Sequence, residues 1–253
     1  MQLNNPAIFI GCAGWQLGRE HLPAFPVAGT HLQRYAAQLG GVEINSSFYR
    51  PHRRQTYERW AESVPKGFRF CVKVPKLITH ERRLQGCARE LEAFVWQCCG
   101  LNDRLGCLLV QLPPSLVFDR DISEAFFIEL RRLHDGHVVL EPRHESWRDA
   151  EPLLQEYRVA RAAVDPSRIA GDAAPAGWPG LRYWRLHGSP RIYFSPYEVP
   201  ALRILADELQ TPSGTCEATW CIFDNTASGA ALGNALTLSH FCRSEHARDG
   251  RQR

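Results

Sequence analysis

The residues with the most evident chemical capacity follow short apolar segments. In the segment EPRHESW, Glu141, Arg143, His144 and Trp147 bring a carboxylate, a guanidinium, an imidazole and an indole into seven positions. Such groups can hold an anion and move a proton. Because side chains alternate along a strand, Glu141 and Arg143 point to the same side and either form a buried ion pair or face a ligand together. The segment predicts part of a polar pocket.

A second carboxylate comes with several hydrogen-bonding groups. The segment EINSSFYR contains Glu43, Asn45, Ser47 and Tyr49. If the apolar residues around it form a strand, Glu43 lies inside or at the lip of the sheet, with the polar groups just beyond. The alternative is that these groups cap a following helical segment.

Two more segments end apolar runs with polar residues. YWRLHG contains Arg185 and His187, which share a strand face because they are two residues apart, and FDNT contains Asp224 and Asn225. The alternative role for Asp224 and Asn225 is to cap the last helix.

Positive groups recur at the same kind of position. Lys73 lies near the end of another apolar run, and His80 follows in the stretch VKVPKLITHERRL. Together with Arg143 and Arg185, Lys73 would create a local positive field that suits a carboxylate or a phosphate. We therefore predict a small phosphorylated or carboxylated ligand, and we favour a site without a metal.

The predicted site has two sets of residues. Those expected to move protons are Glu43, Glu141 and His187. Those expected to contact the ligand are Trp15, Asn45, Ser47, Tyr49, Lys73, His80, Gln111, Arg143, His144, Trp147, Arg185, Asp224 and Asn225. A carboxylate beside an arginine has a lowered pKa, so Glu43 is the better base of the two glutamates.

These groups need a scaffold that brings distant segments to one opening. Eight apolar runs are typical of buried parallel strands: Ile8–Cys12, Gly41–Ile44, Phe68–Val74, Cys107–Leu112, His137–Glu141, Arg161–Asp165, Tyr183–His187 and Trp220–Asp224. Helical patterns lie between them, over Thr30–Leu39, Thr56–Val64, Cys87–Cys99, Ile122–Leu133, Ala150–Tyr157, Pro200–Leu209 and Gly229–Cys242. This alternation predicts an α/β fold, a TIM-type (β/α)8 barrel, whose ligands bind where the strands end.

The pattern changes after the sixth run. Residues Gly171–Gly180, GDAAPAGWPG, are rich in Gly and Pro, which predicts a loop in place of a full helix. An open doubly wound sheet is the alternative to the barrel. We expect one domain over residues 1–243 and a polar tail that frays over 244–253.

Composition limits the classes of function. Hydrophobic residues make up 44% of the 253 residues, and the formal net charge is only +3, so the molecule has no strong overall field for nucleic acid. We expect a cytoplasmic protein without a membrane partner, because no secretory leader pattern and no stretch of about 18 apolar residues occurs. The nine cysteines form no CxxC pair and are expected to be buried, reduced thiols. Cys12 is the one plausible cysteine nucleophile.

Seven dispersed motifs together resemble the DUF72 family, also called YecE-like proteins. They are GCAGW, EINSSFYR, VKVPKLITHERRL, QLPPS, EPRHESW, YWRLHG and FDNT, in family order from about Gly11 to Thr226. The resemblance implies a bacterial protein with a TIM-barrel-type fold. It also implies motif positions at the predicted site residues and at Gly14 and Thr79. It implies no reaction.

A metal-dependent phosphodiesterase or nuclease is an alternative function. Its divalent metal would be held by Glu43, Glu141, Asp165, His187 and Asp224. Against it, no HxH, HxxxH or HExxH spacing occurs, and arginines beside these ligands would repel a cation.

A noncatalytic module that binds a nucleotide or a nucleic acid is the other alternative. The basic clusters Arg50–Arg54 and His80–Arg83 would supply the positive surface that nucleic acid needs, or they are solvated loops. The composition of a site does not separate binding from turnover, and the sequence does not set the oligomeric state.

Overall fold

The structure, a computed structural model, describes residues 6–167, 169 and 172–249. Its strands are β1 (Ala7–Cys12), β2 (Gly41–Ile44), β3 (Arg69–Lys73), β4 (Leu105–Gln111), β5 (His137–Glu141), β6 (Val159–Arg161), β7 (Ala163–Asp165), β8 (Ala176–Gly177), β9 (Leu181–Leu186) and β10 (Ala218–Phe223). Its α-helices are α1 (His31–Ala36), α2 (Ser46–Tyr49), α3 (Arg54–Glu62), α4 (Ala88–Cys98), α5 (Arg120–Leu133), α6 (Glu151–Glu156), α7 (Val199–Gln210) and α8 (Ala230–Asp249). Short 3₁₀ segments cover Arg19–Ala24, Cys99–Arg104 and Glu145–Ala150, and a π-helical turn covers Leu77–Glu81.

Each of the eight predicted apolar runs overlaps a strand, which confirms the alternation predicted from the sequence. The sixth run divides in two at Ala162: β6 pairs with β5, and β7 pairs with β9. The backbone N–H of Ala162 still donates to the carbonyl of Leu140 in β5 at 2.9 Å. The sixth segment therefore passes from one sheet to the other.

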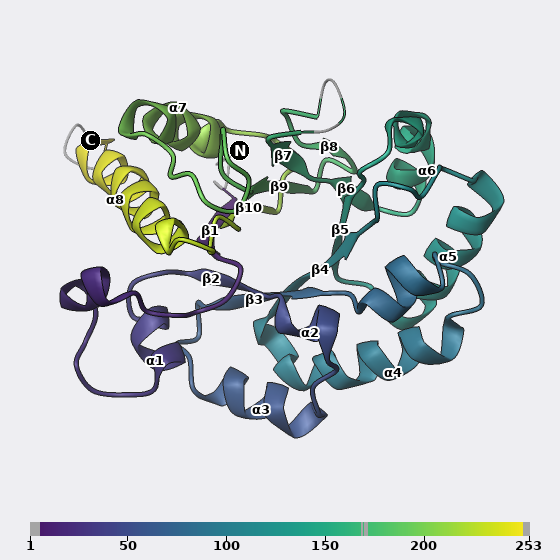
Figure 1. Cartoon of the computed structure of the whole chain (residues 1–253), viewed down its shortest axis with the longest axis horizontal. Helices are drawn as coiled ribbons and strands as arrows, with labels where there is room; N and C mark the ends of the chain where they lie inside the picture. Colours follow the sequence, from purple (N-terminus) through teal and green to yellow (C-terminus); the bar gives the residue numbers. More distant parts are fainter. Residues whose placement is uncertain (1–5, 168, 170–171, 250–253) are drawn as a thin grey trace.

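The strands pair into two sheets, with the orders β1-β10-β9-β7 and β2-β3-β4-β5-β6-β8. Neighbouring strands are parallel, except that β6 and β8 are antiparallel. An isolated parallel bridge between Ala13 and Glu43 joins the end of β1 to β2. In Figure 1 the longer helices lie around the outside of the strands. The fold is α/β with parallel sheets. The strand pairing gives two sheets and not the single closed barrel expected from the sequence.

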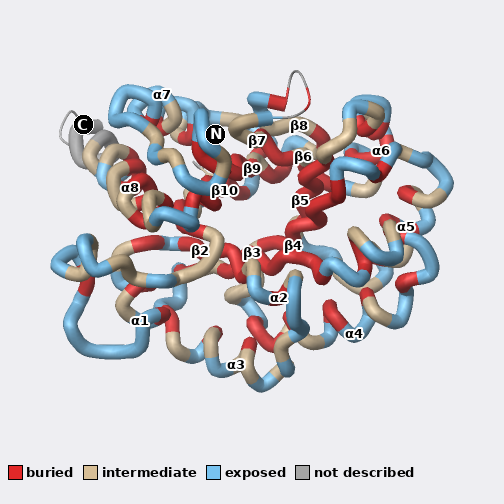
Figure 2. Tube along the Cα trace, in the orientation of Figure 1, coloured by how far each residue is buried: buried red, intermediate tan, exposed pale blue. Residues whose placement is uncertain are grey.

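Strand residues, many of them coloured as buried in Figure 2, divide alternately between two cores. In β4, Leu108 and Val110 belong to the core shared with the helices, whereas Leu109 belongs to a smaller core among the strands. In that smaller core the rings of Tyr183 and Trp220 stack with centroids 6.2 Å apart. Because both faces of each strand are covered, the strands read as continuous apolar runs.

The region after β7 follows the prediction of a loop. The described residues between β7 and β9 form no helix, and they contribute only the short strand β8, in which Gly177 pairs with Ala160. The predicted start of the loop, Gly171, lies outside the described residues.

The carboxyl-terminal helix is longer than predicted. The sequence pattern placed its end at Cys242 and a frayed tail over 244–253, but α8 continues to Asp249. Residues 250–253 lie outside the described residues. Within the described part of the chain, no helix combines the length and the apolar character needed to cross a bilayer.

Candidate functional site

A fully buried guanidinium, that of Arg185 in β9, connects three carboxylates from different strands. Its Nε and Nη2 lie 2.9 and 2.7 Å from the two carboxylate oxygens of Glu43, at β2. Its Nη1 lies 3.1 Å from Oε2 of Glu141, the last residue of β5, and Nη2 lies 3.0 Å from Oδ2 of Asp224, which follows β10. The carboxyl ends of these parallel strands therefore converge, as the sequence predicts.

Strand alternation places these groups. In β9, Tyr183 and Arg185 are two residues apart, and His187 follows two residues later, so the three side chains share one face. The hydroxyl of Tyr183 donates to Oε2 of Glu43 at 3.3 Å. Tyr183 was missed at the sequence level, although the same alternation could have found it.

His187 lies between two carboxylates. Its Nδ1 is 3.0 Å from Oδ2 of Asp224, and its Nε2 is 3.3 Å from Oε1 of Glu141. Burial acts to lower the pKa of His187, but Glu141 and Asp224 outweigh burial and raise it. His187 is thus a candidate proton donor.

Glu141 is held as a carboxylate by its donors. Besides Arg185 and His187, the side-chain amide of Gln111 donates to Oε1 at 2.9 Å and Nε of Arg143 donates to it at 3.0 Å. Burial opposes ionisation, but Arg185 and His187 outweigh it and hold the pKa of Glu141 well below its usual range. Glu141 is therefore a poor general acid at neutral pH.

Lys73, at the end of β3, lies in a different setting. Its Nζ donates to Oδ1 of Asn45 at 3.0 Å and lies 4.2 Å from the ring centre of Phe48. Burial, followed by the charge of Arg185, lowers the pKa of Lys73 to about 8. Nearby, burial together with Lys73 and then Arg143 lowers the pKa of His80 to about 4, so this imidazole is neutral at pH 7.

The charges of this cluster nearly balance. Its carboxylates are those of Glu43, Glu141 and Asp224, and its lysine and arginines are Lys73, Arg143 and Arg185. A protonated His187 adds one positive charge. Arg185 itself is 0% exposed and uses every guanidinium nitrogen on carboxylates, so it positions those groups and offers no donor to a ligand.

Four predicted residues lie on a cavity of about 560 Å³ beside the cluster. They are Trp15, Glu43, Asn45 and Tyr49. Trp15 packs edge-on against Trp60 with ring centroids 5.0 Å apart, and Tyr49 is 69% exposed at the rim. Glu43 connects the cavity with the buried cluster, because it contributes to both.

Other predicted contacts have structural roles. Trp147 is buried, and its Nε1 donates to the carbonyl of Leu116 at 2.9 Å, so it packs in the core and does not face the site. His144 caps the 3₁₀ segment Glu145–Ala150 by accepting from the backbone of Ser146.

The side chains of Ser47 and Asn225 also have structural roles, because both form hydrogen bonds with backbone carbonyls. The hydroxyl of buried Ser47 bonds to the carbonyls of Ile44 and Lys73 at 2.8 and 2.6 Å. Nδ2 of buried Asn225 donates to the carbonyl of Ser195 at 2.9 Å and to Oδ1 of Asn234 at 3.0 Å. The sequence left a structural role open for both residues, because both follow a strand end just as ligand contacts do.

The loop after β9 covers the cluster. Tyr193 in this loop has a φ of 69°, and its ring lies edge-on to that of His187 with centroids 5.6 Å apart. The hydroxyl of Tyr197 donates to Oδ2 of Asp165 at 2.7 Å and accepts from the backbone N–H of Gly188 at 2.9 Å. The carboxylate of Asp165 therefore holds the loop through its hydrogen bond with Tyr197.

The metal-ligand set of the alternative function does not assemble as proposed. Within the described residues, no group of three or more His, Cys, Asp or Glu has a geometry that could hold a metal ion. The guanidinium of Arg185 lies among Glu43, Glu141 and Asp224, where a divalent cation would have to compete with it.

Cys12 does not fit a nucleophilic role. Burial raises the pKa of its thiol to about 12, although Tyr35 opposes this shift. Eight of the nine cysteines are buried, as expected.

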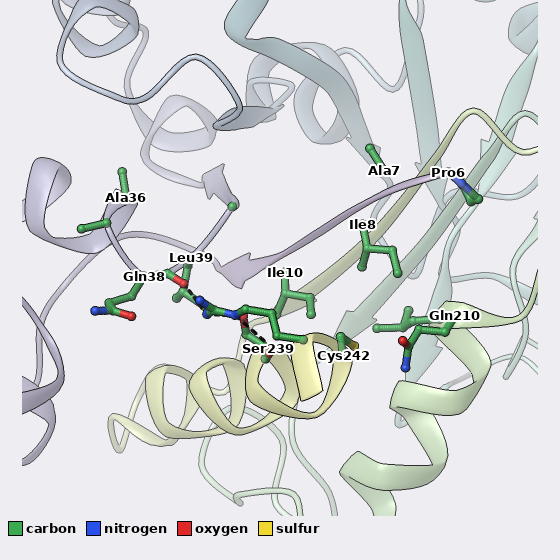
Figure 3. A pocket seen from close by; sticks show the side chains of 14 residues that line it. Pro6, Ala7, Ile8, Ile10, Ala36, Gln38, Leu39, Gln210, Ser239 and Cys242 are labelled. Carbon is green, nitrogen blue, oxygen red and sulfur yellow. Dashed lines mark hydrogen bonds between the residues drawn. The ribbon is translucent and has the colours of Figure 1, made fainter. Parts of the chain in front are cut away.

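A second cavity, of about 580 Å³, lies at the amino-terminal side of β1 (Figure 3). Apolar side chains such as Ile8, Ile10 and Leu39 line it. Arg243 spans its edge by donating to the carbonyl of Gln38 at 2.8 Å. This cavity lies away from the strand ends that carry the ionisable cluster.

Comparison with known sequences identifies relatives of the chain. A family model described as "Protein of unknown function DUF72" matches residues 9–252. The UPF0759 protein YecE of Escherichia coli is 31% identical over 108 residues, which are 43% of this chain and 38% of that protein. The UPF0759 protein YunF of Bacillus subtilis is 26% identical over 148 residues, covering 55% of this chain and 52% of the relative. The matched part thus spans about half or less of these curated relatives.

Two solved structures are similar over nearly the whole chain. A DUF72 family protein from Enterococcus faecalis has a TM-score of 0.77 at 22% identity, covering 93% of this chain and 95% of the other. A DUF72 family protein from Thermotoga maritima has a TM-score of 0.73 at 22% identity, with coverages of 95% and 99%. At these identities the likeness supports the fold alone.

Proposed function

Since the chain belongs to the DUF72 family, we propose that it binds a small phosphorylated or carboxylated compound at the carboxyl ends of its strands. The observation that carries this proposal is the separation of cations into two sets. Arg185 is fully buried and paired with carboxylates, whereas the side chain of Arg143 is 19% exposed at the edge of the same cluster. A guanidinium in that position can bind an anion with its remaining N–H groups.

Neighbouring groups support an anion at Arg143. Only Nε of Arg143 is used by Glu141, and the Tyr193 hydroxyl is a further partner that contributes to its raised pKa against the effect of burial. The low pKa of His80 reflects burial and then the positive charges of Lys73 and Arg143, so the potential around this imidazole is positive. An anion placed there would relieve the repulsion between the cations.

The proposed chemistry is proton transfer next to the bound anion. His187, whose pKa is raised by two carboxylates against the effect of burial, is the proposed acid. The proposed base is Glu43, a residue of the cavity lining whose fully buried carboxylate accepts two hydrogen bonds from Arg185. In this assignment the acid is His187 and the anion is held by Arg143, and both side chains contact Oε1 of Glu141.

The scaffold we propose is a (β/α)8 barrel built from the two sheets. The bridge between Ala13 and Glu43 supports one junction, and the divided sixth segment, paired with β5 through β6 and with β9 through β7, supports the other. In such barrels ligands bind at the end where these side chains lie.

Thermal unfolding with added anions tests the proposal. Phosphate, glycerol 3-phosphate and lactate are titrated against the wild type and Arg143→Ala, with the exposed α4 residue changed in Arg89→Ala as a charge-matched control. A ligand at ten times its Kd stabilises by about 1.4 kcal/mol, which raises Tm by roughly 3–6 °C in a domain of this size. We expect this shift in the wild type and Arg89→Ala and its loss in Arg143→Ala. Absence of stabilisation by every anion in the wild type contradicts the proposal.

The fold of Arg143→Ala is checked separately by circular dichroism. Gln111 and Arg185 still donate to Glu141 in that variant, so we expect it to fold. If it unfolds without added denaturant, Arg143 has a structural ion-pair role.

A further inference from the structure

Lysine is rare in this chain, and Lys73 is a buried lysine. Of the 30 lysines and arginines, 27 are arginines, and the three lysines are Lys66, Lys73 and Lys76. Lys66 and Lys76 are exposed, and Lys76 pairs with Glu81 at 3.1 Å. Lys73 is 5% exposed. A guanidinium is never deprotonated in a protein, whereas an ammonium can be, so a buried lysine in a chain that otherwise uses arginine suggests a role for the neutral amine.

The amine of Lys73 has few polar contacts. Nζ donates to one neutral acceptor, Oδ1 of Asn45, and the ring of Phe48 covers one side. Within the described residues, no carboxylate oxygen lies within 4.0 Å of Nζ. The ammonium is therefore buried without a direct counter-ion, an arrangement that favours loss of its proton.

The charged groups around Lys73 come from every strand end of the cluster. The groups that affect it are Arg185 from β9, Glu43 from β2, Glu141 from β5 and Asp224 after β10. Lys73 in turn lowers the pKa of His80, on the π-helical turn. Burial and Arg185 dominate over the three carboxylates and bring the pKa to about 8.

We propose that Lys73 is a nucleophilic amine that forms a Schiff base with an aldehyde or ketone carrying a carboxylate or phosphate group. This inference rests on the proposed function, because Arg143 would hold the anionic group while the carbonyl faces Lys73. The neutral Nζ attacks the carbonyl carbon, and a C–N bond forms. The nitrogen loses two protons, the carbonyl oxygen leaves as water, and a C=N bond remains, so no oxidant or reductant is needed.

Reductive trapping tests the inference on the intact chain. Pyruvate and dihydroxyacetone phosphate are the carbonyl probes, and lactate and glycerol 3-phosphate are their matched anions without a carbonyl. Cyanoborohydride donates a hydride to the C=N bond and fixes the adduct, which is located by mass spectrometry after trypsin digestion. An adduct on Lys73 blocks cleavage there and appears in peptide 70–76, whereas one on Lys76 appears in peptide 74–82.

We expect a stoichiometric adduct on Lys73 from at least one carbonyl probe at pH 7.5. At that pH an amine with a pKa of about 8 has an unprotonated fraction on the order of a hundredfold greater than an ordinary lysine. Labelling should be lost in Lys73→Arg and kept in Lys76→Arg, and it should rise with a midpoint near pH 8.

The outcomes separate the two proposals. If lactate or glycerol 3-phosphate stabilises the protein but no carbonyl probe labels Lys73, the anion site stands and the Schiff base is refuted. Labelling spread evenly over Lys66, Lys73 and Lys76 also refutes it. If no anion stabilises the protein, the proposed function fails whatever the labelling shows.

Discussion

Glu43 and Arg185 are 142 residues apart in the chain and form a two-point ion pair, with Nε and Nη2 of the guanidinium 2.9 and 2.7 Å from the two carboxylate oxygens. Both side chains are fully buried. The pair fixes the ends of β2 and β9 relative to each other, and through Glu141 and Asp224 it extends to β5 and β10. A buried ion of this kind stabilises only while all of its partners remain.

Replacement of Arg185 by methionine should destabilise the protein strongly. It leaves Glu43, Glu141 and Asp224 without their shared counter-ion, which costs about 3–5 kcal/mol. Urea unfolding measures the change. Arg185→Lys should recover little of it, because an ammonium cannot make the same two-point contact. A loss under about 1 kcal/mol in Arg185→Met would show that the network is not needed for folding.

His187 should make stability depend on pH above neutrality. Its pKa in the folded state is raised above the ordinary 6.5. Its ion pairs therefore contribute fully below pH 6.5 and are lost as the pH rises through the raised value. The wild type should lose more unfolding free energy than His187→Gln over this range, in urea titrations at a series of pH values. Parallel curves for the two proteins would exclude the charged imidazole.

Lys73→Met should stabilise the protein while removing its chemistry. Lowering the lysine pKa from 10.5 to about 8 corresponds to at most about 3 kcal/mol of destabilisation near pH 7. The pH dependence of stability has the opposite sign to that expected for His187. The stability of the wild type should rise as the pH increases from 8 towards 10.5, and the variant should lack this rise. Calorimetry at pH 7 and pH 10 checks both statements. A variant less stable than the wild type at pH 7 would mean that the bond to Asn45 outweighs the cost of burial.

Trp147→Phe should affect stability and leave anion binding unchanged. The substitution removes the donor to the buried carbonyl of Leu116, which costs about 1–3 kcal/mol. The stabilisation that phosphate gives should match that of the wild type. A smaller stabilisation by phosphate than in the wild type would show that Trp147 contributes to the binding site.

The sequence predicted the strands and the convergence of Glu43, Glu141, Arg185, His187 and Asp224, because parallel strand ends must meet at one edge. It did not predict which charges pair. Arg143 and Arg185 look equivalent in sequence, and only the register of distant strands makes one fully buried and leaves the other partly exposed.

Loop residues were harder to predict than strand residues. Alternation fixes the direction of a side chain in a strand, but no such rule told whether Trp147 or Asn225 faces a ligand or the core. The end of α8 was also misplaced, because helix length was read from apolar periodicity, and the helix continues past Cys242, where that periodicity ends.

The central claim is that Arg143, not Arg185, presents positive charge to a ligand, at a site that Lys73 adjoins. A crystal soaked in selenate tests it most directly, because the anomalous signal of selenium locates this phosphate-like anion without reference to any assumed site. We expect a peak within hydrogen-bonding distance of the Arg143 guanidinium on the side of Lys73. A peak bound to Arg185, or selenate found only at surface arginines such as Arg89, would contradict the account.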